Sequence, residues 1–517
     1  MRVTHFYINE PMLLDNKRFY FFLLVLCLYF GIVFVGADFY KTPFKDYKDF
    51  MVLIMQWGIV LFASFGLLLA LVSNKYLFAV AFPLLAVVAS ALAYFRFTLN
   101  MTVNANIVEA ALDNDMRTST DLISVAFIFF VVLNFLISLI FVYYRWTKIC
   151  LSHSVIYLFA GIVIIFSTTR FFGSIKGAIQ NRIPYVLYYS FRDYEDDKKN
   201  IRTNRPDFPG NISCAEDSLI VVYVQGEALR ADHLHLNGYQ RQTTPLLENA
   251  HAISLKQIYS PYTYTDRSVP YILTNADSLH PDFAYQNRSF ISLFNGCHFH
   301  TYWIAGQNPA TAFVYFAKEA DSLIYTAAGK TVYNFEPYSW LDGEALEPLQ
   351  KIVSNGYAKK LVVVHTIGSH WWYKTHYTKA FEKFSPVIES RIVSSNTKEE
   401  MINTYDNTIL YTDYFLNNII QLLKNKKAIL IYLSDHGESL GEDGKWLHAE
   451  DALPEHRPAC IVWLSDKYKK EDPLAENILQ QNAPEYFNTS FLFPSILDAA
   501  HIQTPVLDTS ASIFRLH

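Results

Sequence analysis

The stretch Ala428-Ile429-Leu430-Ile431-Tyr432-Leu433 runs directly into Ser434-Asp435-His436-Gly437-Glu438-Ser439-Leu440-Gly441-Glu442. Its first six residues are apolar and rich in β-branched side chains, which is typical of a buried strand. The run stops at an acidic residue and a histidine, and both residue types are ligands of metal ions in proteins. The stretch therefore predicts a strand that delivers two metal ligands to the edge of a sheet.

The composition of the chain places part of it in lipid. Of its 517 residues, 51% are hydrophobic and 18% are charged, which is too apolar for a soluble protein of this size. The net charge of −5 comes without a basic stripe, so nucleic acid is not expected as a partner. The five cysteines lack metal-ligand spacing and form no disulfide framework, although one bridge is compatible with their number.

Five long apolar segments come first in the chain. They cover residues 19–36, 50–72, 76–94, 122–143 and 154–168. Each is close to the ~20 residues that a helix needs to cross a bilayer, although the last is short. Soluble cores rarely supply so many uncharged runs in succession, so we predict about five transmembrane helices. The first apolar run is too long for a cleavable signal, and no small-residue cleavage site follows it.

Basic residues set the expected orientation of these helices. Those on the side that would be cytoplasmic are Arg2, Lys17, Arg18, Lys75, Arg145 and Lys148, and those that oppose this orientation are Lys41, Lys45 and Lys48. An odd number of spans then places the C-terminal part outside the cytoplasm, in the periplasm.

The sequence divides into three segments, a transmembrane domain over 1–170, an interfacial helix and linker over 171–217, and a catalytic domain over 218–517. Residues 178–194 mix apolar and charged side chains, which suits a helix lying on the membrane surface. The polar outer loop 99–121 is either simply solvated or binds a lipid head group.

From Ser218 onward, short apolar runs alternate with longer mixed segments, which indicates an α/β domain with a mostly parallel central sheet. The candidate strands are 219–224, 301–304, 361–364, 428–433 and 460–464.

Three of these strands end in polar clusters. The clusters are Gln225-Gly226-Glu227, His365-Thr366-Ile367-Gly368-Ser369-His370 and Asp435-His436. Ligands bind at the carboxyl ends of strands in open α/β sheets, so these clusters can converge although they are far apart in sequence. The pattern favours a metal-dependent enzyme.

Glu227, Asp435 and His436 supply two carboxylates and an imidazole, a set that suits zinc with an open coordination position. His365, His370 and His448 are candidates for supporting the metal ligands or for acid–base work. Taken singly, a histidine is more often structural, but these lie in one group of motifs.

A nucleophile is expected in the stretch Tyr262-Thr263-Tyr264-Thr265-Asp266-Arg267-Ser268-Val269-Pro270, which has several hydroxyls ahead of an expected helix. A helix N-terminus favours the negative charge of a phosphate group. Spacing alone leaves Thr263, Thr265 and Ser268 open, and a plain helix cap is the alternative role for any of them.

These motifs together resemble the phosphoethanolamine transferases of bacterial envelopes, a family within the alkaline phosphatase and sulfatase superfamily that includes the mobile colistin-resistance enzymes. The stretches that carry the resemblance are Gln225-Gly226-Glu227-Ala228-Leu229-Arg230-Ala231-Asp232-His233, Leu236-Asn237-Gly238-Tyr239, Thr243-Thr244-Pro245, Thr265 with Ser268-Val269-Pro270, Gly368-Ser369-His370, Tyr405-Asp406-Asn407-Thr408-Ile409-Leu410-Tyr411-Thr412-Asp413, the opening stretch from Ser434 to Glu442, and Leu447-His448. They follow the family's order, and about five preceding spans fit its architecture.

The resemblance implies roles for individual residues. Glu227, Asp435 and His436 match the family's zinc ligands, and Thr265 matches the threonine that binds zinc and becomes phosphorylated. His370 and His448 match the histidines that contact the transferred group and assist proton transfer. The implied enzyme uses one or two zinc ions and acts as a monomer in the bacterial inner membrane. It moves phosphoethanolamine from phosphatidylethanolamine to lipid A, a lipopolysaccharide core sugar or another envelope glycan, and releases diacylglycerol.

The chain also departs from the family pattern. Pro261 and Tyr271 stand where many members flank the nucleophile loop with cysteines, so packing and hydrogen bonds must hold this loop. The segment 303–309 lacks the family's lysine, and the outer-loop spacing is not reproduced around Ala110, Asn114 and Thr118. The candidate contacts to the lipid head group and the acceptor are Asn114, Gln307, Asn308 and His365.

Three rival functions fit the sequence less well. A glycerol-phosphate transferase of the lipoteichoic acid synthase type shares the fold and a threonine nucleophile, but its signature differs around Gly226-Glu227-Ala228-Leu229-Arg230. A sulfatase would need a Cys-x-Pro-x-Arg or Ser-x-Pro-x-Arg motif, which the sequence lacks. The intact ligands and nucleophile argue against a catalytically silent membrane binding protein.

Overall fold

The computed structural model describes residues 10–40, 42, 47–99, 103, 108, 123–151, 153–171, 179–180, 182–199, 205–307, 314–326 and 337–517. These residues form two compact units that meet in the sequence at Glu195 and Asp196. The described residues up to Glu195 are called the helical unit, and those after it the sheet unit. The finer division at residues 170 and 217 stays a prediction.

The helical unit consists of long helices. They are α1 (Glu10–Phe30), which continues through the π-helical turn η1 (Gly31–Val35) into α2 (Gly36–Tyr40), then α3 (Tyr47–Ser73), α4 (Lys75–Leu99), α7 (Val125–Lys148), α8 (Ser154–Phe171) and α10 (Val186–Lys199). Among the described residues, four stretches are long and apolar enough to cross a membrane, namely Lys17–Tyr40, Phe50–Ser73, Lys75–Thr98 and Val125–Lys148. The fifth predicted span, Ser154–Thr168, is an apolar helix of shorter length, as its sequence indicated.

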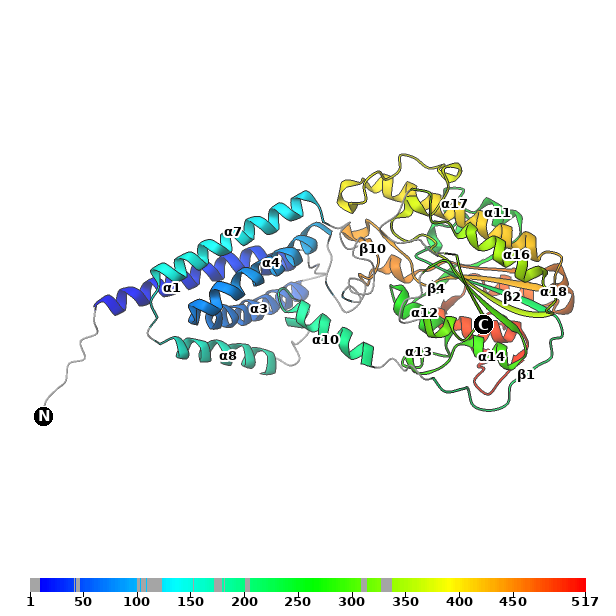
Figure 1. Cartoon of the computed structure of the whole chain (residues 1–517), viewed down its shortest axis with the longest axis horizontal. Coiled ribbons are helices and arrows are strands. Elements are labelled where there is room, and N and C mark those ends of the chain that lie inside the picture. Colours follow the sequence, from blue (N-terminus) through cyan, green and yellow to red (C-terminus); the bar gives the residue numbers. More distant parts are fainter. Residues whose placement is uncertain are drawn as a thin grey trace. The chain divides into compact units, whose positions relative to one another are not determined.

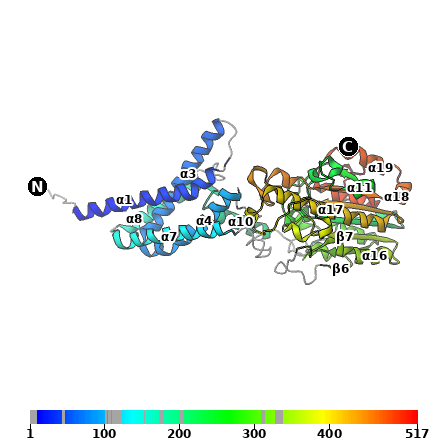
Figure 2. The same cartoon turned by 90° about the horizontal axis from the view of Figure 1, so that it is seen from above.

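Small residues let two of these helices approach closely. α3 packs along α8, and α4 packs along α7 (Figures 1 and 2). A side chain on Gly161 of α8 would lie 2.6 Å from the backbone oxygen of Gly66 in α3. In lipid, helices associate mainly through such close packing, because burial of apolar surface drives association much less than it does in water.

The predicted surface helix over 178–194 is helical at residues 179–180 and again from Val186, with a turn at residues 182–185 between them. α10 runs from Val186 to Lys199, past the predicted end of this helix. After α10, the next described residues are irregular until β1 (Ser213–Cys214). Most of the polar outer loop 99–121 lies outside the described residues.

The sheet unit is built on a seven-stranded sheet. Its order is β3 (Ile253–Leu255), β11 (Cys460–Leu464), β8 (Ala428–Ser434), β2 (Leu219–Gly226), β7 (Lys359–His365), β5 (His300–Ala305) and β6 (Ser322–Tyr325). The five strands from β8 to β6 are parallel, and β11 and β3 are antiparallel additions at one edge. The predicted mostly parallel sheet is therefore confirmed, and all five candidate strands form.

Helices cover both faces of this sheet. They are α11 (Pro245–Asn249), α12 (Thr265–Leu273), α13 (Phe283–Gln286), α14 (Phe290–Gly296), α15 (Val314–Ala317), α16 (Leu346–Ser354), α17 (Lys398–Leu423), α18 (Asp466–Glu471), α19 (Ala475–Asn482) and α20 (Leu492–Ala499). α11, α16 and α17 lie on one face and α12 and α14 on the other (Figure 1). Short strand pairs flank the main sheet, namely β1 with β13 (Ile502–Gln503), β9 (Ser439–Leu440) with β10 (Trp446–Leu447), and β4 (Gln257–Tyr259) with β12 (Tyr486–Asn488).

Side chains along β2 point alternately to the two faces of the main sheet, and both sets are buried, so helices must cover both faces. Leu219, Val221 and Tyr223 point into a large apolar core shared with α12, α14 and α20, and the intervening residues are equally buried on the other side. A strand buried on both faces reads as one continuous apolar run, which is how the sequence predicted it. All five cysteines, including buried Cys297 and Cys460, are free thiols.

Candidate metal centre

The parallel strands of the main sheet end at one edge, and the predicted metal ligands lie there. Gly226 at the end of β2 pairs with Ser434 at the end of β8. Glu227 follows the first strand and Asp435 and His436 follow the second, so the ladder places them side by side although more than 200 residues separate them. Gly226 is required at this point because a side chain there would lie 2.4 Å from the ring of Tyr432.

Three side-chain atoms converge at this edge. Glu227, Asp435 and His436 are fully buried, and their ligand atoms lie within 4.8 Å of one another. His436 Nε2 is 3.2 Å from Glu227 Oε1 and 3.6 Å from Asp435 Oδ2. Among the described residues, none of these three atoms has a hydrogen-bond partner. Buried polar atoms are nearly always satisfied, so this cluster fits a bound divalent cation.

The remaining polar atoms of the three ligands are held by the protein. Asp435 Oδ1 accepts hydrogen bonds from the backbone N–H groups of Ala228 (3.2 Å) and His436 (2.8 Å). His436 Nδ1 donates to the carbonyl of Gly437 at 2.7 Å, which leaves Nε2 with its lone pair when the ring is neutral. Such contacts orient metal ligands and fix the imidazole tautomer.

The charges of the cluster are strongly coupled. Burial, followed by the charge of Glu227, raises the pKa of Asp435 to about 7. Burial alone would lower the pKa of His436, but the neighbouring carboxylates raise it to about 10. Burial likewise opposes ionisation of Glu227, but the adjacent His436 ring, when it is charged, holds the pKa of Glu227 below the ordinary value. Positive charge is therefore favoured between the two carboxylates, and a metal ion would supply it.

Thr265 joins this cluster from a third element. It is the first residue of α12, and its hydroxyl donates to Glu227 Oε2 at 2.9 Å. The Ser268 hydroxyl donates instead to the carbonyl of Tyr262 at 3.3 Å, and Thr263 accepts from the Ala449 N–H through its backbone. Of the three candidate nucleophiles, the structure places the Thr265 hydroxyl at the predicted metal ligands.

The nucleophile loop is held without a covalent link, as its lack of cysteines implied. Tyr271, which stands in place of one cysteine, is buried and packs edge-on against Tyr262 with ring centroids 5.5 Å apart.

Two further histidines lie beside the ligands. The His448 ring centroid is 4.5 Å from that of His436 and 5.6 Å from that of His370. His370 Nδ1 bonds to the carbonyl of Trp371, and burial lowers the pKa of the His370 ring. The structure thus brings His370 and His448 together with all four predicted metal-binding residues.

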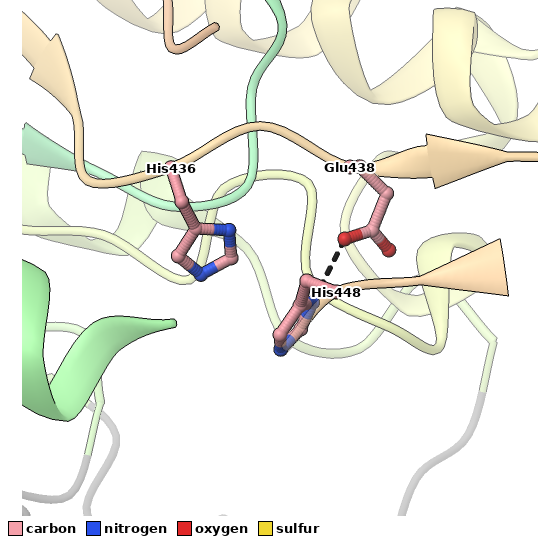
Figure 3. A group of neighbouring side chains, drawn as sticks. All are labelled: His436, Glu438 and His448. Carbon is pink, nitrogen blue, oxygen red and sulfur yellow. Dashed lines mark hydrogen bonds and ion pairs between the residues drawn. The ribbon is translucent and has the colours of Figure 1, made fainter. Parts of the chain in front are cut away.

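Glu438 is a site residue that the sequence reasoning missed. Its Oε2 accepts a hydrogen bond from His448 Nδ1 at 2.8 Å (Figure 3), and its Oε1 accepts one from the Tyr373 hydroxyl at 2.6 Å. Burial opposes protonation of His448, but the Glu438 charge raises the pKa of its ring. The signal was available in the sequence, because Glu438 follows His436 within the opening stretch. His436, Glu438 and His448 also form a second group with ligand atoms within 4.8 Å of one another.

The predicted substrate contacts are only partly described. Gln307 Nε2 donates to Glu227 Oε2 at 3.2 Å and to the carbonyl of Thr366 at 2.7 Å, so it holds the side chain of a predicted metal ligand in place. His365 ends β7 and is fully buried, with Trp303 edge-on to its ring, and burial lowers its pKa to about 4. Asn114 and Asn308 lie outside the described residues.

A tight loop supports Glu227 from behind. Ser369 N–H donates to the Glu227 carbonyl at 3.0 Å, and the buried Asp342 carboxylate accepts from the N–H groups of Ile367 (2.8 Å) and Gly368 (3.1 Å). Gly368 has a φ of +52°, and a side chain there would lie 2.7 Å from the Glu227 carbonyl oxygen. Asp342 gave no signal in the sequence, since it belongs to no motif and is far from its partners along the chain.

Arg230 connects the loops that carry the ligands. Its guanidinium donates to the carbonyl of Glu438 at 3.1 Å and to the Glu442 carboxylate at 2.6 Å. It also pairs with Asp232 at 2.7 Å. The residues after β2 are thereby tied to those after β8.

Comparisons with known proteins agree with this geometry. Residues 220–502 match the family model of sulfatases, and residues 61–188 match a family model described as phosphoethanolamine transferase EptA/EptB. The chain is 28% identical over 315 residues to phosphoethanolamine transferase EptA of Escherichia coli K12, an alignment that covers 57% of this chain and 56% of that protein. The chain thus spans little more than half the length of this relative.

Two other proteins are similar over most of the chain. Kdo(2)-lipid A phosphoethanolamine 7''-transferase of Escherichia coli K12 is 25% identical over 507 residues, which cover 88% of each protein. The solved structure of the integral membrane lipooligosaccharide phosphoethanolamine transferase A from Neisseria meningitidis has a TM-score of 0.78 at 23% identity, and the match covers 95% of this chain and 97% of that one. This structural likeness extends the shared fold to both units.

Proposed function

We propose that this chain, which belongs to the sulfatase family and to the phosphoethanolamine transferases within it, moves phosphoethanolamine from phosphatidylethanolamine to an envelope glycolipid. The observation that carries the proposal is the Thr265 hydroxyl, which lies 2.9 Å from Glu227 beside three converging ligand atoms that have no hydrogen bond among the described residues. Relatives named for lipid A modification support lipid A, or the sugar core attached to it, as the acceptor.

Zinc is the proposed metal, because two carboxylates, an imidazole and a hydroxyl form a mixed oxygen and nitrogen set. Glu227, Thr265, Asp435 and His436 would hold it. A zinc ion bound there would lower the pKa of the Thr265 hydroxyl and draw charge from the phosphoryl oxygens. The proposal includes one or two metal ions, but Glu438 in the second group, His436, Glu438 and His448, is engaged by His448 and Tyr373 and is not proposed as a ligand.

The first half of the proposed reaction loads the enzyme. The Thr265 oxygen attacks the phosphorus of the donor, and the bond from phosphorus to the diacylglycerol oxygen breaks. The proton lost by Thr265 is balanced by the proton that diacylglycerol takes up. His448 can deliver that proton from Nε2, because Glu438 holds its Nδ1.

The second half of the reaction transfers phosphoethanolamine from Thr265 to the acceptor. An acceptor hydroxyl gives its proton to a histidine beside the ligands and attacks the phosphothreonine, and Thr265 is regenerated. His370 is the second histidine within reach of this step, since its ring lies beside that of His448. One centre thus serves both transfers, which predicts ping-pong kinetics.

The proposed location is the inner membrane of a bacterium, with the sheet unit in the periplasm. The four apolar helices support a multi-pass membrane protein, and the basic residues Arg145 and Lys148 at the end of α7 support this orientation. A similar solved domain is described as the periplasmic domain of its own protein. The proposed functional form is a monomer.

Release of diacylglycerol from fluorescent phosphatidylethanolamine tests the proposal. The purified chain with zinc should release it and gain the mass of one phosphoethanolamine group on the peptide that contains Thr265. Thr265→Ala should abolish both signals. Thr263→Ala and Ser268→Ala are matched controls, since they remove the neighbouring hydroxyls and should keep the phosphoenzyme.

Three outcomes would reject the proposal. Labelling that persists in Thr265→Ala would reject the nucleophile, and turnover of phosphatidylglycerol in preference to phosphatidylethanolamine would reject the donor. Mass spectra of lipid A, core oligosaccharide and periplasmic glycans that are identical with and without the protein would reject the acceptor class.

A further inference from the structure

Residues 448–456, here called the His448 loop, follow β10 and lead toward β11. The centroid of the His448 ring lies 4.5 Å from that of His436. The backbone is strained on both sides of His448, because Leu447 and Ala449 have φ values of +68° and +71°. Residues with side chains keep such a conformation only where surrounding contacts impose it. The position of the His448 ring therefore depends on what holds this loop.

Hydrogen bonds at both ends of the His448 loop tie it to the chain around the nucleophile. The Ala449 N–H donates to the carbonyl of Thr263 at 3.1 Å. At the other end, the Ser260 N–H donates to the His456 carbonyl at 2.9 Å, and His456 Nδ1 donates to the Ser260 carbonyl at 2.7 Å. Ser260 directly precedes the nucleophile loop. The proposed proton donor and the proposed nucleophile are thus linked through this short set of contacts.

The side chain of His456 also closes the His448 loop on itself. Its Nε2 lies 2.9 Å from Asp451 Oδ1, and its ring stacks on that of Tyr259 with centroids 5.1 Å apart and planes 10° apart. Both ring nitrogens thus face oxygen atoms that only accept, so the ring makes both hydrogen bonds when it carries both protons. Burial opposes this charge, but the hydrogen bond to Asp451 raises the pKa of His456 above its ordinary value.

The two hydrogen bonds of the His456 ring differ in their exposure to solvent. His456 is 7% exposed and Ser260 is fully buried, whereas the side chain of Asp451 is 80% exposed. An ion pair with an exposed partner contributes little in water. The buried bond from His456 to Ser260 therefore provides most of the link between the two loops, and Asp451 mainly favours the charged ring.

We propose that His456 is a positioning residue for the transfer reaction, because it holds the His448 loop against the nucleophile loop and so keeps the His448 ring where it can protonate the leaving diacylglycerol oxygen. His456 acts through the backbone of the loop and not on the donor lipid. This inference rests on the proposed function, which assigns that proton to His448.

A donor whose leaving group needs no proton separates the positioning of His448 from general damage. Phosphatidylethanolamine loads Thr265 with delivery of a proton to diacylglycerol, whereas the p-nitrophenyl diester of ethanolamine phosphate would load it with release of the nitrophenolate anion. His456→Phe keeps a ring to stack on Tyr259 but removes both N–H donors. In single-turnover experiments on the zinc-loaded full chain, this variant should release diacylglycerol about tenfold more slowly and nitrophenolate within about twofold of the wild-type rate.

Hydrogen exchange, measured by mass spectrometry, gives a second readout that does not depend on activity. The Ala449 N–H should exchange several-fold faster in His456→Phe than in the wild type. His300→Phe is the matched control, because His300 also stacks on a tyrosine, with centroids 4.0 Å apart, and lies 3.6 Å from an aspartate. It stands at the amino end of β5, at the edge of the sheet opposite the predicted metal ligands. It should change neither the exchange at Ala449 nor either release rate.

Asp451→Ala is a second variant of the same contact, and its exposed position makes loss of the fold unlikely to interfere. It should slow diacylglycerol release by about two- to fivefold, with nitrophenolate release unchanged, because it removes one of the two acceptors of the His456 ring.

Either of two results would overturn the inference. Equal slowing of both leaving groups would mean that His456 supports the fold or the metal cluster as a whole. Unchanged exchange at Ala449 in both His456→Phe and Asp451→Ala would mean that other contacts hold the His448 loop. A wild-type chain that releases no diacylglycerol would reject the proposed function and with it the role of His456, and the exchange measurement distinguishes that failure from the absence of the link.

Discussion

Glu438→Gln replaces a buried carboxylate by an amide of nearly the same shape. The carboxylate accepts one hydrogen bond from His448 Nδ1 and one from the Tyr373 hydroxyl. The amide oxygen can keep the bond to Tyr373, but the amide nitrogen then faces His448 as a donor. The imidazole then switches tautomer so that Nδ1 accepts and Nε2 carries the proton. Without the charge of Glu438, which raises the pKa of His448, the ring stays neutral, and a neutral imidazole is a poor acid for the leaving diacylglycerol oxygen.

The expected loss follows from that change. Partners that orient the groups of a metal site typically change activity by about 10- to 100-fold when mutated, and this range corresponds to ~1.4–2.8 kcal/mol in the activation free energy. The loss should appear in kcat for diacylglycerol release, with KM little changed, because Glu438 contacts His448 and not the donor. The zinc content of the purified variant, measured by mass spectrometry, should equal that of the wild type.

Glu455→Gln is a matched control for the loss of a buried carboxylate. Glu455 is also fully buried, but it accepts hydrogen bonds from the Ser439 hydroxyl and the Glu450 N–H instead of from a histidine. It should lower the melting temperature and leave kcat of the folded protein within about twofold. The reasoning fails if Glu438→Gln keeps wild-type kcat, or if its activity falls only in proportion to lost zinc, since Glu438 would then be a metal ligand.

Three further outcomes are expected. Gly368→Ala should weaken zinc binding about tenfold or more, because the new side chain at φ +52° collides with the backbone of Glu227, whereas Gly356→Ala, which has open space around it, should not alter a zinc titration. Burial raises the pKa of Glu319 to about 7. Between about pH 4.5 and 7 the folded chain therefore binds more protons than the unfolded chain, and the free energy of unfolding falls as the pH rises through this range. The difference in melting temperature between Glu319→Gln and the wild type should therefore favour the variant more at about pH 8 than at about pH 5. The same difference at both pH values would refute the raised pKa of Glu319. Chelation should abolish phosphoenzyme formation and lower the melting temperature, with zinc restoring both, since a ligand of the folded state stabilises it; activity that survives chelation would exclude a metal mechanism.

The sheet and its ligand-bearing edge could be predicted because both depend on local sequence patterns. Buried parallel strands read as apolar runs, and the polar residues that follow them must lie at the edge of the sheet. Short edge strands such as β3 and β6 were missed, since three or four residues carry too little pattern to be distinguished from a loop. The antiparallel direction of β11 also depends on the path of the chain and not on its composition.

The site could be predicted only in part, because its geometry depends on contacts between residues that are far apart in sequence. Spacing left Thr263, Thr265 and Ser268 open as nucleophiles, and only the resemblance separated them, because a hydroxyl's distance to Glu227 depends on how α12 docks. The hydrogen bond from Gln307 to Glu227 and the one from the Ile367 N–H to Asp342 join segments that are far apart along the chain. No local pattern encodes such pairs.

The five free thiols have a consequence for how this protein matures. The sheet unit reaches the described fold with Cys214 and Cys297 in contact as thiols, so it should fold without an oxidant, and the Thr265 loop depends on contacts such as Tyr262 against Tyr271. A cell that lacks disulfide-forming catalysts should still produce active protein, and dithiothreitol should not change its rate. Maturation of the site would then depend on the supply of the proposed metal and not on thiol oxidation.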